Sequence, residues 1–527
     1  MTLRPLLLAA LAGALVVGLL VTSTVAVVQA RRVATEAARA DDLAARVAEL
    51  ERQVDRLEAE GNSSDPLGGL LDGLLDGGTL DGLLGGGGDL DGLLDGLLSG
   101  ITGEVPGVRC LTPEGGGGIG GLLDGGLGDL FGGGDEVPSD PDLLVETITD
   151  QVEQLRERTL DRDVDVAFLD DDELLADLER LLDEDVDPHE LAAHTDVLVA
   201  LRAIPEGSDL AAMQRELLEG QVAGYYATEE ARLVVRTPEG EIRPLDRVTL
   251  AHELGHALVD QVVGLPDLED VDTDAALAQL AVVEGDATLL MNLWTLEHLS
   301  LTDQLGMLGA GDLAGQQAQL EAFPHHLQRE LIFPYTAGLD LICDRWLEGG
   351  WDAVDEAYAE PPLTSAGVLF PDRAADRPVA VPGLTPPPGG TARHDDTFGA
   401  AELLWLFEAP GGDTDAAIAD PAASTAAWAG GEVRLWDVGG DPVVGLSLAD
   451  RDAGDPPLCD SVTEWFTAAA PDATRSGSGS ASGSGSGVEV RFVEAGSATV
   501  IRCDADGVRL AVAPSEAIAT SVVGTRR

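Results

Sequence analysis

The chain has 527 residues, and its 95 acidic residues against 31 basic residues, all of them arginine, give a formal net charge of −64. This charge excludes nucleic-acid binding that depends on neutralising phosphates, and it favours solubility in a salty or extracytoplasmic setting. It does not identify a substrate, although it would steer a cationic one towards the protein.

The N-terminal segment, residues 1–30, contains an apolar run from residue 5 to residue 30 that is long enough to span a bilayer. Its length favours a retained transmembrane anchor, although residues 28–30 would also suit the cleavage site of a signal peptide. Arg31 and Arg32 would place the body in the cytoplasm by the positive-inside rule, whereas the four cysteines indicate an oxidising compartment. We expect a single-pass protein of the cell membrane with an extracytoplasmic body.

Residues 31–140 are predicted to separate this anchor from the rest of the chain. Within residues 31–61, apolar side chains follow heptad spacing over residues 40–57, which predicts a helical stalk or short coiled coil. This seam would support a homodimer, but a single solvated helix fits the short pattern equally well. Residues 62–140 repeat glycine, leucine and aspartate, which predicts a flexible low-complexity linker or, through its leucine pairs, a self-association segment.

From residue 141 onward the sequence is typical of a globular α+β protein. Apolar side chains recur at helical spacing over residues 141–427, which predicts one mostly helical domain. A β-hairpin with strands at 221–227 and 232–237 interrupts the helices. The predicted helices span residues 141–160, 171–183, 188–202, 208–219, 247–263, 275–299, 324–348, 350–358 and 396–408.

Residues 428–527 are predicted to form a small α/β region that packs on, or extends, the helical domain. A helix at 460–470 lies among short strands, and a serine- and glycine-rich loop at 471–487 is expected to be flexible and exposed. The predicted strands span residues 432–438, 443–449, 488–493, 499–503 and 508–513.

The four cysteines lack the close spacing of a cysteine zinc site, so we expect them to form disulfides. Cys459 and Cys503 lie within one small region and are predicted to pair with each other. Cys110 and Cys343 would then form a second pair. Disulfides are typical of proteins outside the cytoplasm.

The segment His252-Glu253-Leu254-Gly255-His256 places two histidines four residues apart in a predicted helix. On a helix both imidazoles lie on one face and can bind one divalent metal ion, usually zinc. Glu253 would then be placed to act as the general base of a hydrolase. The flanking residues are largely apolar, which predicts a buried helix and disfavours the alternative of two solvated histidines on a surface helix.

A catalytic zinc site usually has three protein ligands and one open position for water. The position six residues after His256 is Val262, which rules out a third histidine at that spacing. Glu284 is the predicted third ligand, because it lies inside a long apolar helix where an unpaired carboxylate would be costly. Asp272 and Asp274, in the preceding loop, are the competing candidates.

Four aspartates are given supporting roles by their positions. Asp246 and Asp274 are predicted to cap the N-termini of the two helices that provide the ligands. Asp286 and Asp260 are predicted to accept hydrogen bonds from the metal-binding histidines, which would fix the orientation of the rings. For both of these carboxylates, capping or simple solvation is the alternative interpretation.

These residues resemble the gluzincin metallopeptidases, which combine the HExxH motif with a downstream glutamate. The resemblance is closer to a family of secreted or membrane-anchored bacterial zinc peptidases, in HELGHALVDQ at 252–261 and VEGDAT at 283–288. The chain departs from this family at Phe370, which precedes Pro371 where relatives usually have a histidine. The resemblance covers residues 145–470, with weaker matches at Gly224-Tyr225-Tyr226, Phe333-Pro334-Tyr335, Gly349-Gly350-Trp351 and Pro361-Pro362.

The resemblance implies a mostly helical gluzincin-like body that holds zinc. It also implies that the hairpin before the motif helix supplies a strand beside the cleft, with which an extended peptide substrate can pair. Several side chains are candidates to stabilise the oxyanion of the reaction, with packing or exposure as the alternative for each of them: Tyr225, Tyr226, Tyr335, His325 and His326.

We therefore expect a membrane-anchored, extracytoplasmic zinc metallopeptidase that acts on a peptide or protein substrate. Zinc would activate water and polarise the scissile carbonyl, and Glu253 would pass the proton of the water to the leaving amine. Two alternatives stay open: a tethered scaffold or interaction protein whose zinc is structural or absent, and a zinc hydrolase of non-peptide amides or esters. The intact Glu253 argues against a scaffold, because a structural zinc site needs no base.

Overall fold

A computed structural model describes residues 110, 138 and 140–524, except for residues 186, 238–241, 269–270, 310–317, 452–456, 479–487 and 506. The predicted anchor and stalk lie outside the described residues, as does almost all of the predicted linker. Among the described residues, no helix combines the length and the apolar character needed to cross a membrane. The described part of the chain is a mixed α and β structure.

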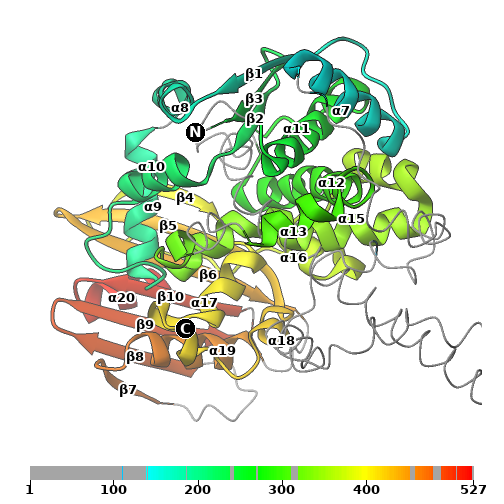
Figure 1. Ribbon diagram of the computed structural model, residues 1–527. Coiled ribbons are helices and arrows are strands. Elements are labelled where there is room, and N and C mark those ends of the chain that lie inside the picture. Colours follow the sequence, from blue (N-terminus) through cyan, green and yellow to red (C-terminus); the bar gives the residue numbers. More distant parts are fainter. Residues whose placement is uncertain are drawn as a thin grey trace, which may run out of the picture. The chain divides into compact units, whose positions relative to one another are not determined.

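Helices dominate the first two thirds of the described chain (Figure 1). Each predicted helix has a counterpart, although the one predicted at 396–408 begins only at residue 400, and α13, α16 and α18 were not predicted. The predicted break between two helices is a kink at Gly349 and Gly350 inside α15. The helices are α7 (Pro141–Arg156), α8 (Asp171–Asp185), α9 (Pro188–Ala200), α10 (Leu210–Gln221), α11 (Pro244–Val262), α12 (Thr273–His298), α13 (Leu301–Gly309), α15 (His325–Ala359), α16 (Ser365–Leu369), α17 (Ala400–Glu408) and α18 (Pro421–Thr425), with short 3-10 turns at Pro371–Arg373, Pro410–Gly412 and Thr414–Ala416.

Helix α12 packs between α11 and α15 (Figure 1). It is apolar around most of its circumference and is buried along most of its length, as expected for a helix enclosed by other elements. A Cβ atom added at Gly285 would lie 2.3 Å from the carbonyl oxygen of Gly338, so only glycine permits this crossing of α12 and α15. The close crossing fixes the middle of α12, which carries Glu284.

A three-stranded sheet lies against α11. Strand β1 (Asp165–Leu169) pairs parallel with β3 (Arg232–Arg236), and β3 pairs antiparallel with β2 (Gly224–Ala227). Strands β2 and β3 form the predicted hairpin, although both are shorter than predicted, and β1 was not predicted. The strand order β1-β3-β2 leaves β2 at an edge of this sheet within the described structure.

A seven-stranded antiparallel sheet contains most of the C-terminal region. Two helices of this region, α19 (Leu458–Ala469) and α20 (Glu516–Val523), pack against it. In sheet order the strands are β4 (Thr391–Thr397), β5 (Trp428–Val438), β6 (Asp441–Asp450), β10 (Gly507–Ala513), β9 (Ser497–Asp504), β8 (Val488–Glu494) and β7 (Thr474–Ser478).

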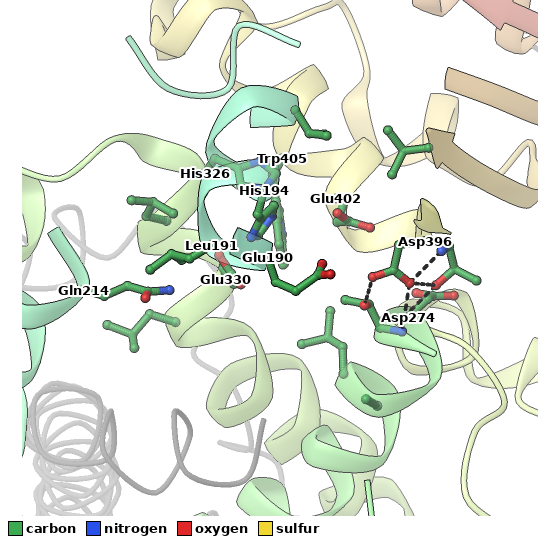
Figure 2. Close-up of a pocket in the computed structure, with 18 of the residues that line it drawn as sticks. Glu190, Leu191, His194, Gln214, Asp274, His326, Glu330, Asp396, Glu402 and Trp405 are labelled. Carbon is green, nitrogen blue, oxygen red and sulfur yellow. Dashed lines mark hydrogen bonds between the residues drawn. The ribbon is translucent and has the colours of Figure 1, made fainter. Parts of the chain in front are cut away.

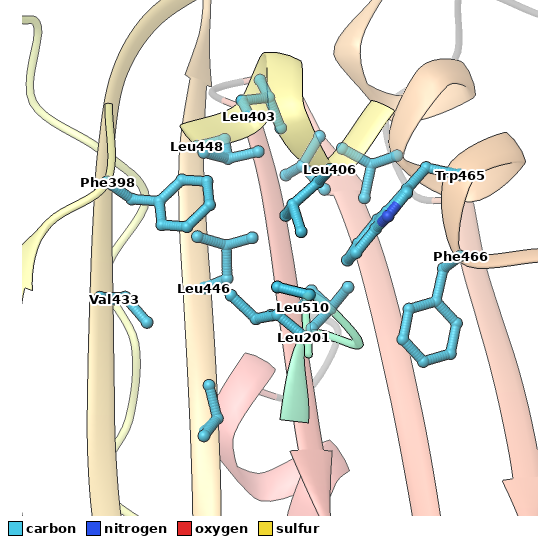
Figure 3. Close-up of a cluster of buried hydrophobic side chains, with 14 of the residues drawn as sticks. Leu201, Phe398, Leu403, Leu406, Val433, Leu446, Leu448, Trp465, Phe466 and Leu510 are labelled. Atoms are coloured by element: carbon cyan, nitrogen blue, oxygen red, sulfur yellow. The ribbon is translucent and has the colours of Figure 1, made fainter. Parts of the chain in front are cut away.

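Alternating side chains give this sheet two buried faces. On β10, Leu510 faces a core shared with α9, α17 and α19, whereas Ala511 faces a smaller core that α20 covers. Figure 3 shows the larger core, in which Leu201 after α9, Leu406 of α17 and Trp465 of α19 converge on the sheet. Residues on both sides of the predicted boundary at 427/428 therefore share one hydrophobic core.

Three local predictions are corrected by the structure. The N-cap of α11 is Arg243, and Asp246 accepts the Arg243 backbone N–H at 2.8 Å from the third helical position. The N-cap of α12 is Asp272, whose side chain accepts the Ala275 N–H, so Asp274 is not the cap. Residues 474–478 of the predicted flexible loop form strand β7 and pair with β8.

Two disulfides are present among the described residues. Cys459 at the start of α19 pairs with Cys503 on β9, which joins the helix to the sheet. Cys110 pairs with Cys343 in the buried part of α15. Both pairs are those expected from the sequence.

Candidate metal centre

The two histidines of the HExxH motif and Glu284 lie together. His252 and His256 are one turn apart on α11, Glu284 faces them from the middle of α12, and all three are buried. The Nε2 atoms of the two histidines are 3.1 Å apart. Oε2 of Glu284 is 3.3 Å from Nε2 of His252 and 3.4 Å from Nε2 of His256. In the described part of the chain, these three residues form the one group of potential ligands close enough to hold a common metal ion.

These separations match the geometry of zinc. Zinc binds histidine nitrogen and carboxylate oxygen at about 2.0–2.1 Å in a tetrahedral arrangement, which places neighbouring ligand atoms about 3.3–3.4 Å apart. The observed distances of 3.1, 3.3 and 3.4 Å agree with one triangular face of that tetrahedron. Three protein ligands are typical of catalytic zinc, whereas structural zinc usually has four.

Buried polar atoms around the triad have no hydrogen-bond partner among the described residues. They include Nδ1 of His252, Oε2 of Glu253 and Oε2 of Glu284. Without metal, the imidazoles of His252 and His256 compensate the carboxylate of Glu284, and a cation held by the triad would take over that role. The residues present therefore fit a zinc ion.

Charges within the cluster shift the pKa values of its members. Burial opposes a charge on His256, but the adjacent Glu284 outweighs it and raises the pKa of His256 to about 9. Burial also opposes ionisation of Glu284, yet His256 and His252 lower the pKa of Glu284 to about 2. Glu284 is therefore ionised at neutral pH and favours a positive charge where the three ligand atoms meet.

Glu253 lies between the triad and the edge strand β2. Burial raises the pKa of Glu253 to about 8, and the backbone of Tyr226 on β2 hydrogen-bonds its carboxylate. A Cβ atom added at Gly224 would lie 2.7 Å from the carbonyl oxygen of Val234 and 3.5 Å from Cγ of Glu253. The absence of a side chain at Gly224 thus lets the strand run close to the proposed base.

Tyr335 is the oxyanion candidate that the structure brings to the triad. It comes from α15 and is fully buried, and its ring stacks on His252 with 6.2 Å between the centroids. Its hydroxyl hydrogen-bonds Glu284, and burial together with that carboxylate raises its pKa well above the usual value. The hydroxyl is therefore protonated and adjacent to a ligand atom.

The other candidates have different partners. The hydroxyl of Tyr225 hydrogen-bonds Asp177. The hydroxyl of Tyr226 donates to Asp260 at 2.9 Å, so the backbone of Tyr226, not its side chain, is directed at Glu253. His325 contacts Glu408, with 3.0 Å between Nε2 and Oε2, and His326 packs edge-on against Trp405.

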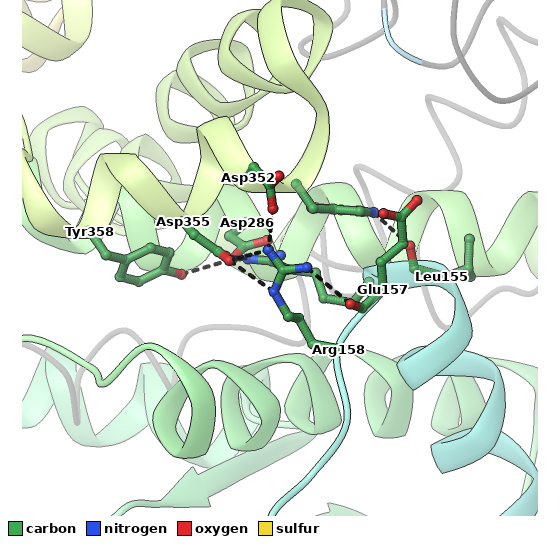
Figure 4. Close-up of polar contacts among 9 residues, drawn as sticks. Leu155, Glu157, Arg158, Asp286, Asp352, Asp355 and Tyr358 are labelled. Atoms are coloured by element: carbon green, nitrogen blue, oxygen red, sulfur yellow. Dashed lines mark hydrogen bonds and ion pairs between the residues drawn. The ribbon is translucent and has the colours of Figure 1, made fainter.

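The aspartates predicted to orient the histidines also have other partners. Oδ2 of Asp286 accepts hydrogen bonds of 3.0 Å from both Arg156 and Tyr358 (Figure 4). Asp260 accepts the hydroxyl of Tyr226. Among the described contacts, neither carboxylate hydrogen-bonds His252 or His256. Asp286 instead forms a buried pair with Arg156 within an ion-pair network, which is defined by Arg156, Arg158, Asp286, Asp355 and Tyr358.

Sequence reasoning missed this network, although one signal for it was present. The buried residues of α7 recur every fourth position, at Leu144, Ile148, Val152 and Arg156. Arg156 thus occupies a core position of an otherwise apolar stripe, which indicates a buried partner of opposite charge. The partner itself, Asp286, lies 130 residues away and could not be identified from spacing.

Comparisons with protein-family models, with curated proteins and with solved structures each found no match to this chain. The function therefore has to be argued from the site itself.

Asp272 and Asp274, the competing third ligands, are engaged at the start of α12. Asp272 accepts the Ala275 N–H, and Asp274 accepts the backbone N–H of Ser365 at 3.1 Å.

Proposed function

We propose that this protein is a zinc-dependent peptidase that hydrolyses peptide bonds. The observation that supports it most strongly is the convergence of three ligand atoms within 3.4 Å of one another beside a buried glutamate. A structural zinc site needs no such glutamate. The unpaired Oε2 of Glu253 supports a catalytic role for the site.

When bound, zinc would supply Lewis-acid activation of water and of the scissile carbonyl. His252, His256 and Glu284 would hold it. The charge of a bound zinc ion would oppose the effect of burial on the pKa of Glu253 and favour its ionised form. In that form Glu253 would accept the proton of the attacking water and deliver it to the leaving amine. The protonated hydroxyl of Tyr335 donates to Glu284 in this structure, and it would have to turn from Glu284 to donate to negative charge that develops on the carbonyl oxygen.

The edge strand β2 supports a peptide as the substrate. Strand addition binds an extended peptide through its backbone, without a requirement for particular side chains. Because the backbone of Tyr226 hydrogen-bonds Glu253, a peptide paired along the free edge of β2 would run past the proposed base. This arrangement favours a peptide over a small non-peptide amide or ester.

The proposal includes an extracytoplasmic location and an N-terminal membrane anchor. Two disulfides support an oxidising compartment. The apolar run at residues 5–30 supports the anchor. Protease protection of the full chain in membrane vesicles of known orientation tests both points together.

Zinc analysis combined with peptide turnover tests the function. We expect the purified full chain to contain one zinc per molecule and to cleave members of a peptide library. Glu284→Gln should lose both zinc and turnover, whereas Glu297→Gln, at an exposed position of the same helix, should keep both. Zinc without turnover of any peptide would favour the scaffold, and turnover of esters or non-peptide amides alone would favour the other hydrolase.

A further inference from the structure

A cavity of about 220 Å³ lies among α9, α10, α12, α15 and α17, apart from the metal triad (Figure 2). Its volume is below the roughly 300–1,000 Å³ of pockets that hold drug-sized ligands, so it suits a single long side chain. Many of its lining side chains are apolar, among them Leu191, Met213, Leu277, Leu280, Phe323 and Leu331.

Two carboxylates in this cavity are available to a ligand. Glu330 of α15 has no hydrogen-bond or ion-pair partner among the described residues, and burial raises its pKa to about 7. Glu402 of α17 uses Oε2 to accept the Gly399 N–H at 2.7 Å, which leaves its other oxygen. None of the described residues that line the cavity is an arginine. Burial and the neighbouring carboxylates raise the pKa of Glu402 well above its usual value, so the cavity offers two carboxyl groups whose ionisation a bound cation would favour.

A buried histidine provides an independent sign of a ligand. His326 lines the cavity and is 4% exposed, and its Nδ1 has no hydrogen-bond partner among the described residues. Burial lowers the pKa of His326 to about 3, so its ring is neutral and one of its nitrogens can accept a hydrogen bond. Acceptors with an unsatisfied capacity require a ligand that donates.

Three other acidic groups of the cavity are already engaged. Glu190 contacts Nδ1 of His394 at 3.0 Å, and Asp274 accepts hydrogen bonds from Ser365. Asp396 accepts the Thr397 N–H at 2.7 Å. Glu330, Glu402 and His326 therefore remain as acceptors for a ligand, and Nε1 of Trp405, which also lines the cavity, is a donor without a hydrogen-bond partner among the described residues.

Two helices connect the cavity with the metal centre. On α12, Leu280 lines the cavity and Glu284 follows one turn later on the same face. On α15, Leu331 lines the cavity and Tyr335 follows one turn later. The wall of the cavity therefore lies about one helical turn, roughly 5–6 Å along each axis, from groups of the triad.

We propose that this cavity binds the arginine or lysine side chain of a peptide substrate at a position near the scissile bond. The apolar wall suits the methylene stem, and Glu330, Glu402 and His326 accept hydrogen bonds from the cationic head. The net charge of −64 attracts such peptides. This inference rests on the proposed peptidase function and names its substrate class.

Matched peptides that differ at one position test the proposal with the zinc-loaded full chain. We expect kcat/KM at one subsite to be at least about tenfold higher for arginine or lysine than for citrulline or norleucine, because a hydrogen-bonding site discriminates against analogues that lack the donor or the charge. Glu330→Gln and Glu402→Gln should each reduce that ratio towards one, and Glu297→Gln should not change it. Thermal unfolding checks that the variants fold.

A binding experiment separates this inference from the proposed function. Calorimetry with n-butylguanidinium and the uncharged n-butylurea should show binding of the cation alone, and Glu330→Gln should abolish it. Cleavage without any preference for basic side chains overturns the inference and keeps the peptidase. Binding of n-butylguanidinium without cleavage of any peptide overturns the peptidase, and with it the substrate assignment, and leaves a cation site. If the protein neither cleaves any peptide nor binds n-butylguanidinium, both the peptidase proposal and this inference are overturned.

Discussion

Two carboxylates two residues apart on α12 face opposite sides of the helix and are compensated in different ways. Glu284 faces two histidines, whose Nε2 atoms lie 3.3 and 3.4 Å from its Oε2. Asp286 faces Arg156, which lies 3.0 Å away and is itself fully buried. Residues two apart on a helix differ by about 200° in direction, so the two carboxylates lie on opposite faces of α12 and contact different neighbours.

The difference lies in where the positive charge comes from. The chain supplies a guanidinium for Asp286, and Asp355 and Tyr358 complete that network (Figure 4). For Glu284 the neighbours are imidazoles at the spacing of zinc ligands, and the described chain supplies no arginine. A buried carboxylate paired by its own chain indicates a structural role, and one left to an external cation indicates a binding site.

The largest expected effect comes from the base beside the triad. Glu253→Gln should lower kcat by about 10³-fold or more, because a positioned general base contributes roughly 10²–10⁴-fold. Its zinc content should stay at one per chain, since Glu253 is not a ligand. Steady-state kinetics with metal analysis on the same samples checks both. A variant that cleaves as fast as the wild type would remove Glu253 from the reaction.

The ion-pair network should contribute to the free energy of unfolding and should not affect zinc binding. Asp286→Asn leaves Arg156 with a charge that only Asp355 compensates, and breaking one partner of a buried pair typically costs about 3–5 kcal/mol. We therefore expect the free energy of unfolding in urea to fall by that order, with zinc content unchanged in the folded protein. Loss of zinc at full stability would contradict the division of roles between the two faces.

Glu284→Gln is the matched variant on the other face. Without metal, the imidazoles of His252 and His256 compensate the ionised Glu284, so with a chelator present we expect the variant's free energy of unfolding to fall, by about 3–5 kcal/mol at most. Zinc added to the wild type should raise its melting temperature, because a ligand of the native state stabilises that state, and it should not raise that of the variant. Equal stabilisation of both proteins would place zinc elsewhere.

The parts of the site that could be predicted from the sequence depend on local spacing. His252 and His256 share a helical face by their separation alone, and Glu284 stands out in an apolar helix. Arg156 could be recognised as unusual but not paired, because its partner is 130 residues away. The acidic cavity was not predicted, since its walls come from helices and strands that only the tertiary fold brings together.

The same distinction applies to the fold. The long helices follow from apolar periodicity, which is a property of consecutive residues. Strands β4 and β7 were missed because they consist largely of polar residues. They and β1 are defined by pairing with β5, β8 and β3, which a local pattern does not show. The caps of α11 and α12 were misassigned because aspartates occur at several neighbouring positions, and only the backbone geometry shows which one caps.

A third carboxylate sharpens the comparison, because it is less buried than Asp286 and its compensating cations also come from the chain. Glu408 at the end of α17 contacts Arg329, with Nε to Oε2 at 2.8 Å, and His325 at 3.0 Å, and its side chain is 25% exposed. Burial opposes its ionisation, but the hydrogen bonds from His325 and Arg329 outweigh it and lower the pKa of Glu408. Because its pKa is lowered, the ionised Glu408 stabilises the folded protein at a pH above the ordinary glutamate pKa of about 4.5. This stabilisation is lost as the pH falls through the pKa of Glu408 in the folded state.

The stability difference between the wild type and Glu408→Gln should therefore be about 1 kcal/mol or less at pH 7, because water screens this partly exposed pair. It should shrink as the pH falls below about 5, where Glu408 of the unfolded wild type begins to take up a proton while the folded protein does not yet. Urea unfolding of both proteins between pH 3 and pH 7 measures this difference. The other acidic residues titrate equally in both proteins, so their effect cancels when one free energy is subtracted from the other. A difference that matches the roughly 3–5 kcal/mol of the Asp286 network would show that the source of the cation, and not burial, sets the strength of these pairs.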